Sequence, residues 1–210
     1  MSDAAHAHDD HGHHAHPTGI MRWLTTTNHK DIGSLYLIFA LIMLFAAGSM
    51  ALLIRAELFQ PGLQLTNPDF FNQLTTMHGL IMIFGVIMPA FSGFANWQVP
   101  LMLGAPDMAF PRMNNWAFWI LPVAAFFLMV SFWLPGGAVA GGWTMYPPLF
   151  IQGGISYDLT ILAVHIMGLS SIMGSINIIT TILNMRAPGL TLMKMPLFVW
   201  TWVITAYLLI

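Results

Sequence analysis

The chain has 210 residues, of which 57% are hydrophobic and only 7% are charged. Soluble domains carry about 25% charged residues, so this composition cannot supply a normal water-facing surface. The net charge of −2 gives no basis for nucleic-acid binding, and the lack of cysteine excludes disulfides and thiolate metal sites. The composition predicts an all-α protein that crosses a lipid bilayer several times.

Residues 1–17 form a polar, histidine-rich tail without the apolar stretch of a cleavable signal peptide. Its imidazoles could bind Zn²⁺, Cu²⁺ or Ni²⁺ weakly, and they belong to His6, His8, His11, His13, His14 and His16. An interfacial segment follows, in which Trp23 is expected to anchor at the lipid headgroups. We therefore divide the chain into a tail with its interfacial segment, residues 1–27, and a membrane domain, residues 28–210.

Apolar segments follow one another and predict a bundle of membrane-spanning helices, each crossing a core of about 30 Å. The expected spans are residues 33–54, a second that begins at Asn72 and is ended by Pro100, Gly104 and Pro106, then residues 116–133, 159–185 and 196–210. Between the third and fourth spans, Gly-Gly and Pro-Pro pairs exclude a long helix. Pro122 inside the third span is expected to be tolerated, because neighbouring helices can satisfy the freed carbonyl.

Basic residues gather on one side of this topology. Those on one side are Arg22, Lys30, Arg112, Arg186 and Lys194, and Arg55 falls on the other. The positive-inside rule makes the richer side cytoplasmic, so the amino-terminal tail is predicted in the cytoplasm. His78 then lies towards the outer, periplasmic half of the bilayer and Asp107 at the cytoplasmic face.

The second span contains one titratable side chain, His78. An imidazole at membrane depth is costly unless it is hydrogen-bonded or ligated, and spacing alone leaves both open. The chain offers no companion ligand at zinc-type spacing. A haem iron needs only one neutral imidazole per axial position and an apolar pocket, for which Gly79 would allow close approach and Met82, Phe84 and Phe91 could form walls.

The fourth span carries small and polar residues at spacings of three and four, which places them on one helix face. They are Ser170, Gly174, Asn177, Thr181 and Asn184, flanked by Ser171 and Ser175. Such a stripe can serve close helix packing. Alternatively, together with Asn96 and Asn114 it can scaffold a water chain, since amides both donate and accept hydrogen bonds. Asp107 lies between those two amides in the sequence and could collect protons at the mouth of such a path.

Several motifs together resemble subunit I of the haem–copper oxidases, and specifically the cytochrome c oxidase branch. They are TNHKDIG, HGLIMIF, PAFSGFANWQVPLMLGAPDMAFPRMNN, YPPL, SSIMGSINIITTILNMRAPG and MPLFVW, and they extend from about Thr27 to Ile210. The resemblance implies the first five of about twelve spanning helices of that subunit. The copper ligands and the remaining haem ligands would lie beyond Ile210.

The resemblance implies part of the catalytic subunit of a proton-pumping enzyme in a bacterial inner (cell) membrane that reduces O₂ to water. Haem a at a low-spin and a high-spin site and copper are the implied cofactors. The implied partners are the lipid bilayer, subunits II and III, and cytochrome c, which donates electrons through subunit II. The alternatives are a quinol oxidase of the same superfamily, or a non-catalytic membrane module that binds haem or conducts protons. Residues 1–210 by themselves are expected to be inactive.

The resemblance also implies a proton-uptake path that starts at Asp107. Its members are Asp107, His29, Asn96, Asn114, Asn177, Tyr36, Ser170 and Ser171. One departure is visible at Ala117, where some relatives have a serine, so a water is expected to replace that hydroxyl.

The implied haem residues are His78 as axial ligand, Arg55 as hydrogen-bond donor to the formyl group of haem a, and Trp143 and Tyr146 nearby. For Arg55, an interfacial anchor whose charge reaches the headgroups remains open. A surface Ca²⁺ or Na⁺ site is implied for Glu57, Gln60, Gly62 and Gln64, because oxygen ligands suit hard cations. The resemblance assigns no role to His165, which we interpret as a hydrogen-bonded packing residue.

Overall fold

The computed structural model describes residues 19–210, and these contain only helices and connecting segments. The helices are α1 (Ile20–Thr25), α2 (His29–Glu57), α3 (Pro68–Leu80), α4 (Met88–Leu103), α5 (Pro111–Val130), α6 (Leu149–Gln152), α7 (Ile155–Asn184) and α8 (Leu197–Leu209). A π-helix, Ile81–Ile87, joins α3 to α4. The histidine-rich tail and its predicted weak metal binding lie outside the described residues.

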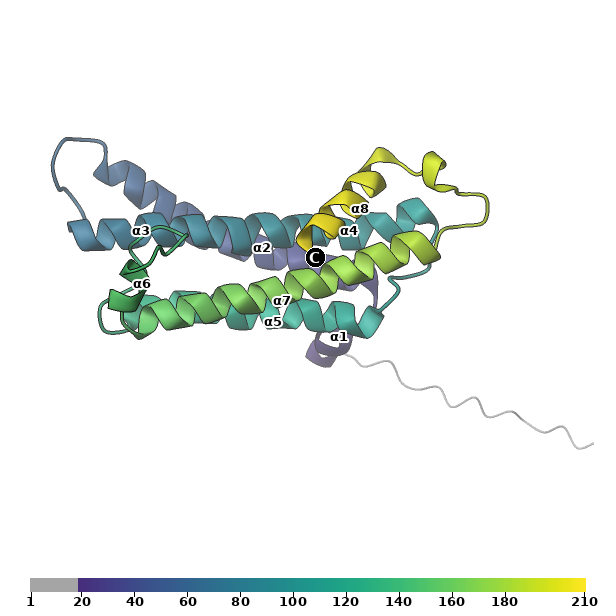
Figure 1. The fold of residues 1–210 in the computed structure, drawn as a ribbon, viewed down its shortest axis with the longest axis horizontal. Coiled ribbons are helices and arrows are strands. Elements are labelled where there is room, and N and C mark those ends of the chain that lie inside the picture. The colour runs from purple at the N-terminus through teal and green to yellow at the C-terminus, as the bar shows by residue number, and fades with distance from the viewer. Residues whose placement is uncertain (1–18) are drawn as a thin grey trace, which may run out of the picture.

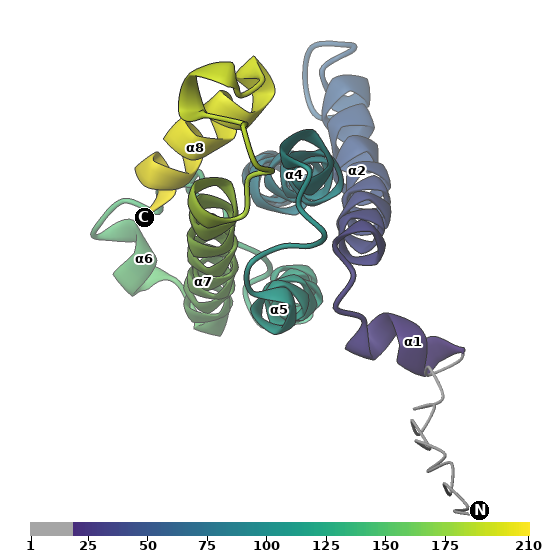
Figure 2. The same ribbon diagram turned by 90° about the vertical axis from the view of Figure 1, so that its right-hand side faces the viewer.

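The long helices run side by side along one axis (Figure 1) and form a bundle when viewed from its end (Figure 2). Within residues 19–210, four segments are long and apolar enough to cross a membrane: His29–Glu57, Pro68–Leu103, Pro111–Trp133 and Ile155–Asn184. The fifth predicted span corresponds to α8, an apolar helix of 13 residues. The predicted all-α, multi-pass architecture is therefore confirmed.

Local sequence signals set the helix ends. The side chain of Asn28 caps α2 by accepting a hydrogen bond from the backbone N–H of Lys30 at 2.8 Å. Asn67 caps α3 in the same way through Phe70, also at 2.8 Å. Gly104 ends α4 in the left-handed conformation at φ 69°, which an L side chain rarely adopts.

The prediction that Pro100 helps to end the second span was wrong. Helix α4 continues through Pro100 to Leu103. Proline has no N–H, so the carbonyl of Asn96, four residues earlier, loses its helical donor. The imidazole Nδ1 of His29 occupies that carbonyl at 2.7 Å, so a neighbouring helix supplies the missing hydrogen bond.

The π-helix between His78 and Asn96 was not predicted. At its end the N–H of Met88 bonds to the carbonyl of Ile83, five residues earlier instead of four. Pro89 follows directly, and its ring would crowd the carbonyl of Gly85 in a regular α-helix. The wider turn relieves this clash, and it changes the faces that α3 and α4 present to the bundle.

Helices α2 and α4 touch backbone to backbone through a glycine pair. A Cβ on Gly33 would lie 2.9 Å from the carbonyl oxygen of Gly93, and a Cβ on Gly93 would lie 3.0 Å from that of Gly33. Small residues permit this approach, as is common between membrane helices. It brings the first turns of α2 within reach of the last turns of α4.

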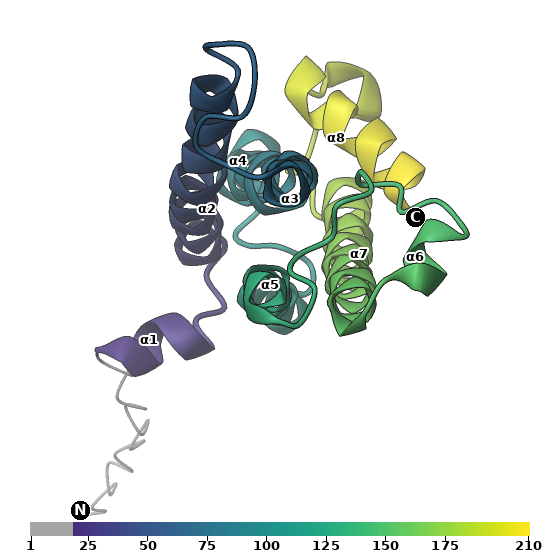
Figure 3. The same ribbon diagram turned by 90° about the vertical axis from the view of Figure 1, so that its left-hand side faces the viewer.

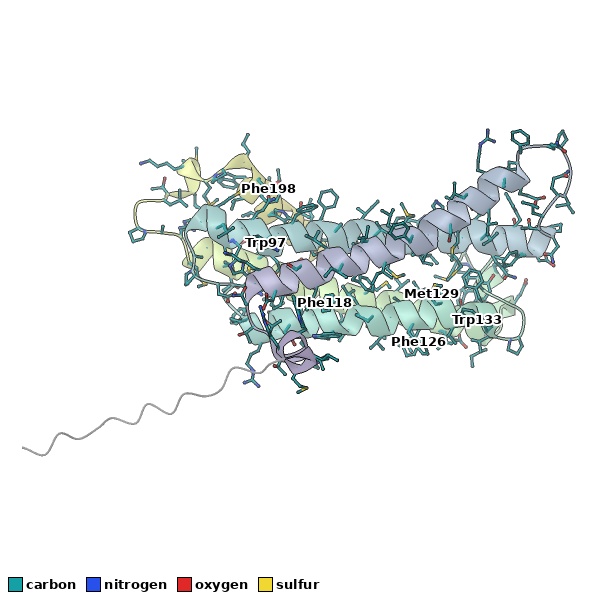
Figure 4. The ribbon with its side chains drawn as sticks, turned by 180° about the vertical axis from the view of Figure 1, so that it is seen from behind. Trp97, Phe118, Phe126, Met129, Trp133 and Phe198 are labelled. Carbon is teal, nitrogen blue, oxygen red and sulfur yellow. The ribbon has the colours of Figure 1, made fainter. Side chains whose placement is uncertain are left out.

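Some aromatic side chains are buried inside the bundle, and others are exposed on its outer surface. Phe118 lies between α2 and α5 (Figure 4), edge-to-face with Tyr36 at 5.1 Å and Phe39 at 6.3 Å. Phe126 and Trp133, further along the segment, are 62% and 76% exposed. Large apolar groups on the outer surface are expected where lipid or further helices replace water.

Candidate functional site

Three predicted site residues meet where α2, α4 and α5 come together. Asn114 donates from Nδ2 to the side-chain oxygen of Asn96 at 2.5 Å, and His29 donates to the backbone carbonyl of Asn96 at 2.7 Å. All three side chains are buried. Asn96 in turn donates to the carbonyl of Ser92 at 2.9 Å, so the cluster extends one turn into α4.

Asp107 lies part-buried in the loop between α4 and α5, next to this cluster in sequence. Its carboxylate accepts a hydrogen bond from the N–H of Met108 at 2.6 Å. The loop is held by α7, because Asn177 accepts from the N–H of Phe110 at 2.8 Å and Thr181 accepts from the N–H of Ala109 at 2.9 Å. The polar stripe of α7 therefore positions the segment that carries Asp107.

Of the other polar residues in the α7 stripe, some pack against neighbouring helices and one is exposed at the surface. Ser170 is buried and donates to the carbonyl of Ala117 on α5 at 2.7 Å. Ser175 is buried as well, whereas Asn184 is exposed at the end of α7. Part of the stripe thus joins α7 to α5, as the packing interpretation expects.

Tyr36, Ser170 and Ser171 are also brought together. They line a cavity of about 20 Å³ to which Ser92 contributes. This space is sufficient for about one water molecule. Since Ser92 also accepts from Asn96, polar groups continue from the asparagine cluster to the cavity. Ser92 was not predicted from the sequence. Its spacing of four residues from Asn96, which places both on one helix face, could have indicated it.

His78 forms a hydrogen bond that fixes its tautomer. Its Nδ1 lies 2.9 Å from the carbonyl oxygen of Ala47 on α2. A carbonyl only accepts, so Nδ1 carries the proton and Nε2 of the neutral ring keeps its lone pair. A Cβ added at Gly48 or at Gly79 would meet no atom within 4 Å, so open space lies beside both ends of this contact. A neutral imidazole flanked by open space suits a haem iron and its flat macrocycle.

Of the predicted walls around His78, Phe91 is wrong, and Met82 and Phe84 stay predictions. Met82 and Phe84 pack against the bundle core. Phe91 lies roughly 20 Å along the helix from His78 and lines a groove with Phe198 of α8. It is therefore too far away to wall a ring bound at His78.

Arg55 is exposed in the last turn of α2, about 12 Å along the helix from Ala47. It makes no hydrogen bond with the described residues. Trp143 lines a pocket of about 350 Å³ together with Gly79, so the loop before α6 reaches the helix of His78. Tyr146 lies in the same loop and is 70% exposed.

That loop is attached to α3 by two side chains that the sequence reasoning missed. Thr76 accepts from the N–H of Gly142 at 3.0 Å, and Gln73 accepts from the N–H of Ala138 at 3.1 Å. Both come from the turns of α3 that precede His78. Their signal was polarity in an otherwise apolar span, which indicates a partner outside the helix.

At the predicted cation site, the carboxylate of Glu57 is engaged by backbone N–H groups. Both carboxylate oxygens accept backbone hydrogen bonds, from Gln64 at 2.7 Å, Leu65 at 2.6 Å and Thr66 at 2.9 Å. Gln60, Gly62 and Gln64 are exposed. Among the described residues, no group of three His, Cys, Asp or Glu side chains could hold a metal. Glu57 thus anchors the loop between α2 and α3, and cation binding stays a prediction.

His165 is hydrogen-bonded but does not pack inside the bundle. Its Nδ1 lies 2.8 Å from the carbonyl of Ile161 in its own helix, and the residue is exposed. The prediction of a packing residue is therefore wrong for the described part of the chain. An intrahelical carbonyl satisfies the ring without any contact to a neighbouring helix.

Comparisons with known proteins agree with these features. The model of the family Cytochrome C and Quinol oxidase polypeptide I matches residues 31–210. The chain is 45% identical over 194 residues to "Probable cytochrome c oxidase subunit 1-alpha" of Streptomyces avermitilis, covering 91% of this chain and 34% of that protein. It is 47% identical over 202 residues to "Cytochrome c oxidase subunit 1" of Corynebacterium efficiens, covering 91% and 35%. The chain thus spans about a third of the length of the curated relatives it matches.

Proposed function

The chain belongs to the cytochrome c and quinol oxidase polypeptide I family, and on this premise we propose that it is part of the catalytic subunit of a proton-pumping cytochrome c oxidase. The enzyme would reduce O₂ to water in aerobic respiration. The names of the relatives favour cytochrome c over quinol as electron donor. The family match likewise disfavours a non-catalytic module, although residues 1–210 by themselves are expected to lack activity.

The observation that carries the proposal is the hydrogen bond from His78 to Ala47. It presents an unprotonated Nε2 beside open space, as an axial haem ligand requires. When bound, the haem, which we propose to be haem a, supplies electron transfer to the oxygen-reducing centre. That centre would hold the high-spin haem and copper, with ligands outside these 210 residues.

Further residues are proposed around the same haem. Arg55 would donate from its guanidinium to a formyl oxygen of the macrocycle, and Trp143 would contribute an aromatic edge through the loop that reaches Gly79. Tyr146 would act from the same loop. The exposed guanidinium of Arg55 has no competing partner among the described residues, which supports this role as well as headgroup anchoring.

We propose that the polar cluster takes up protons from the cytoplasm. Asp107 would exchange a proton with water at the end of the bundle where α5 begins. The proton would then pass the amides of Asn96 and Asn114, near His29, by way of ordered water. Asn177 would hold the entrance loop, and Tyr36, Ser170 and Ser171 would line the water site beyond it. A cytoplasmic amino terminus follows from this orientation, and the division at residues 27 and 28 is kept as part of the proposal.

The proposed partners are those of a multisubunit oxidase. They are the lipid bilayer, subunits II and III, and cytochrome c through subunit II. A Ca²⁺ or Na⁺ ion at the loop after α2 would have to share the Glu57 carboxylate with three N–H donors. Calorimetric titration of the full complex with Ca²⁺ tests this site, and equal heats for wild type and Glu57→Gln would exclude it.

Cofactor analysis of the full-length complex tests the proposed function. Pyridine haemochrome spectra should show haem a, and elemental analysis should show copper. Oxygen consumption should be driven by reduced cytochrome c. Quinol-driven consumption without cytochrome c activity would favour the quinol oxidase, and the absence of both haem a and copper would exclude either oxidase.

A further inference from the structure

A separate cavity lies between α1 and the first turns of α5, at the end of the bundle where α5 begins. Its volume is about 650 Å³, within the range of small-molecule sites. Leu24 and Trp116 contribute apolar walls, and Thr27, Arg112 and Asn115 contribute polar ones. The cavity shares no residue with the His78 site or with the proposed proton path.

The polar side chains of this cavity have unused donors. Arg112 makes no ion pair or hydrogen bond within residues 19–210, whereas the guanidinium of Arg22 on α1 pairs with Asp31 at 3.3 Å. The side-chain nitrogen of Asn115 is enclosed by protein and has no hydrogen-bond partner. Arg112 and Asn115 are three residues apart in α5, so they share one helix face. The lining residues include no carboxylate, so the cavity favours an anion rich in acceptor oxygens.

The position of the cavity matches the level of lipid headgroups. Helix α1 lies at the side of the bundle, next to α5, and runs crosswise to the long helices (Figures 2 and 3). Trp23 on α1 and Trp116 on α5 are 38% and 65% exposed. Exposed tryptophans at the ends of spanning helices mark the boundary between headgroups and hydrocarbon. Arg112, in the first turn of α5, is therefore expected at the level of the headgroups, and Trp116, one turn further along α5, towards the hydrocarbon.

We propose that this cavity binds the headgroup of an anionic phospholipid. The guanidinium of Arg112 would hold the phosphodiester through paired N–H donors, and the N-terminal end of the 20-residue helix α5 would add favourable field. A small rotation of the Asn115 amide would give its orphan N–H an ester or phosphate oxygen. One acyl chain would lie along Trp116 and Leu24. A zwitterionic headgroup would instead bring an ammonium group beside Arg112.

The test uses the full-length complex, stripped of lipid and titrated with phosphatidylglycerol under native mass spectrometry. Wild type should retain one phosphatidylglycerol more than Arg112→Gln, with about tenfold weaker binding in the variant, since a charge-assisted pair is lost. Asn115→Leu should weaken binding without changing the charge. Lys194→Gln removes another exposed cation from the same side of the topology and should bind like wild type. Unchanged haem spectra show that each variant is folded.

Competition experiments distinguish a phospholipid headgroup from a soluble phosphate as the ligand of this cavity. Excess inorganic phosphate should leave the lipid in place, and phosphatidylcholine should bind more weakly than phosphatidylglycerol. Displacement by inorganic phosphate would assign the cavity to a soluble anion and overturn the lipid proposal. Equal lipid retention in wild type, Arg112→Gln and Asn115→Leu would overturn it as well, as would a wild-type complex that retains no lipid because another subunit fills the cavity.

Discussion

The imidazole of His29 donates a hydrogen bond to the backbone carbonyl of Asn96, 67 residues further along the chain and 2.7 Å away. This carbonyl is the one that Pro100 leaves without its helical donor. A helix defect in α4 is thus repaired by a side chain of α2. The same Asn96 accepts from Asn114 through its side chain, so the repair joins three helices at the proposed proton path.

The repair predicts coupling between His29 and Pro100. His29→Leu should destabilise the fold by about 1–3 kcal/mol, because the buried Asn96 carbonyl loses its only donor from outside the helix. In a Pro100→Ala background the new amide should satisfy that carbonyl, and the cost of His29→Leu should shrink. Thermal unfolding of the four proteins in one detergent gives the coupling energy. An equal cost of His29→Leu in both backgrounds would show that Pro100 and His29 are independent.

Neighbouring threonines on α7 test the role of the stripe in positioning Asp107. Thr181→Val removes the acceptor for the N–H of Ala109 and should loosen the entrance loop, with slower proton uptake and about 1–3 kcal/mol lower stability. Thr180→Val is the matched control, since this hydroxyl is exposed and bonds only to its own helix. Stopped-flow uptake measured with a pH dye should separate the two variants. Identical uptake rates in the two variants would show that Thr181 does not position Asp107 for proton uptake.

Asp107→Asn separates proton uptake from a structural role. The variant keeps the size and the acceptor oxygen for the N–H of Met108 but cannot titrate. About 35 Å of helix separate His78 from Leu103, the last residue of α4 before the loop that carries Asp107, so haem spectra should stay unchanged while turnover slows and net proton release stops. Asp107 does not cap α5, because the N-cap is Phe110 and no side chain caps this helix. Proton release at wild-type stoichiometry from reconstituted vesicles would end the uptake role.

The apolar spans and their helix starts could be predicted because they depend on local composition. Asn28, for example, caps α2 directly before an apolar run, and a capping asparagine at such a place is a local sequence signal. The continuation of α4 through Pro100 could not be predicted, because it depends on His29 of another helix. Pro89 signals a disturbed helix, but this proline does not by itself specify a π-helix instead of a kink or a helix end.

The candidate site shows the same division. The asparagines and Asp107 were found by their rarity in apolar spans and by resemblance. Ser92 and Gln73 were missed, because their roles come from a cavity and from a distant loop. Glu57 was predicted as a cation ligand, yet the structure gives its carboxylate three backbone donors from a loop whose conformation its sequence does not specify.

The optical spectrum of His78→Ala in the full-length subunit tests the central claim most directly. The unprotonated Nε2 of His78 is the group that the structure offers to iron, and alanine provides no ligand in its place. The low-spin haem a signal should therefore be lost or converted to a five-coordinate form, while His165→Ala, which removes an exposed imidazole on α7, should leave it intact. An unchanged low-spin spectrum with normal oxygen turnover in His78→Ala would contradict the assignment of this chain as a haem-binding part of the oxidase.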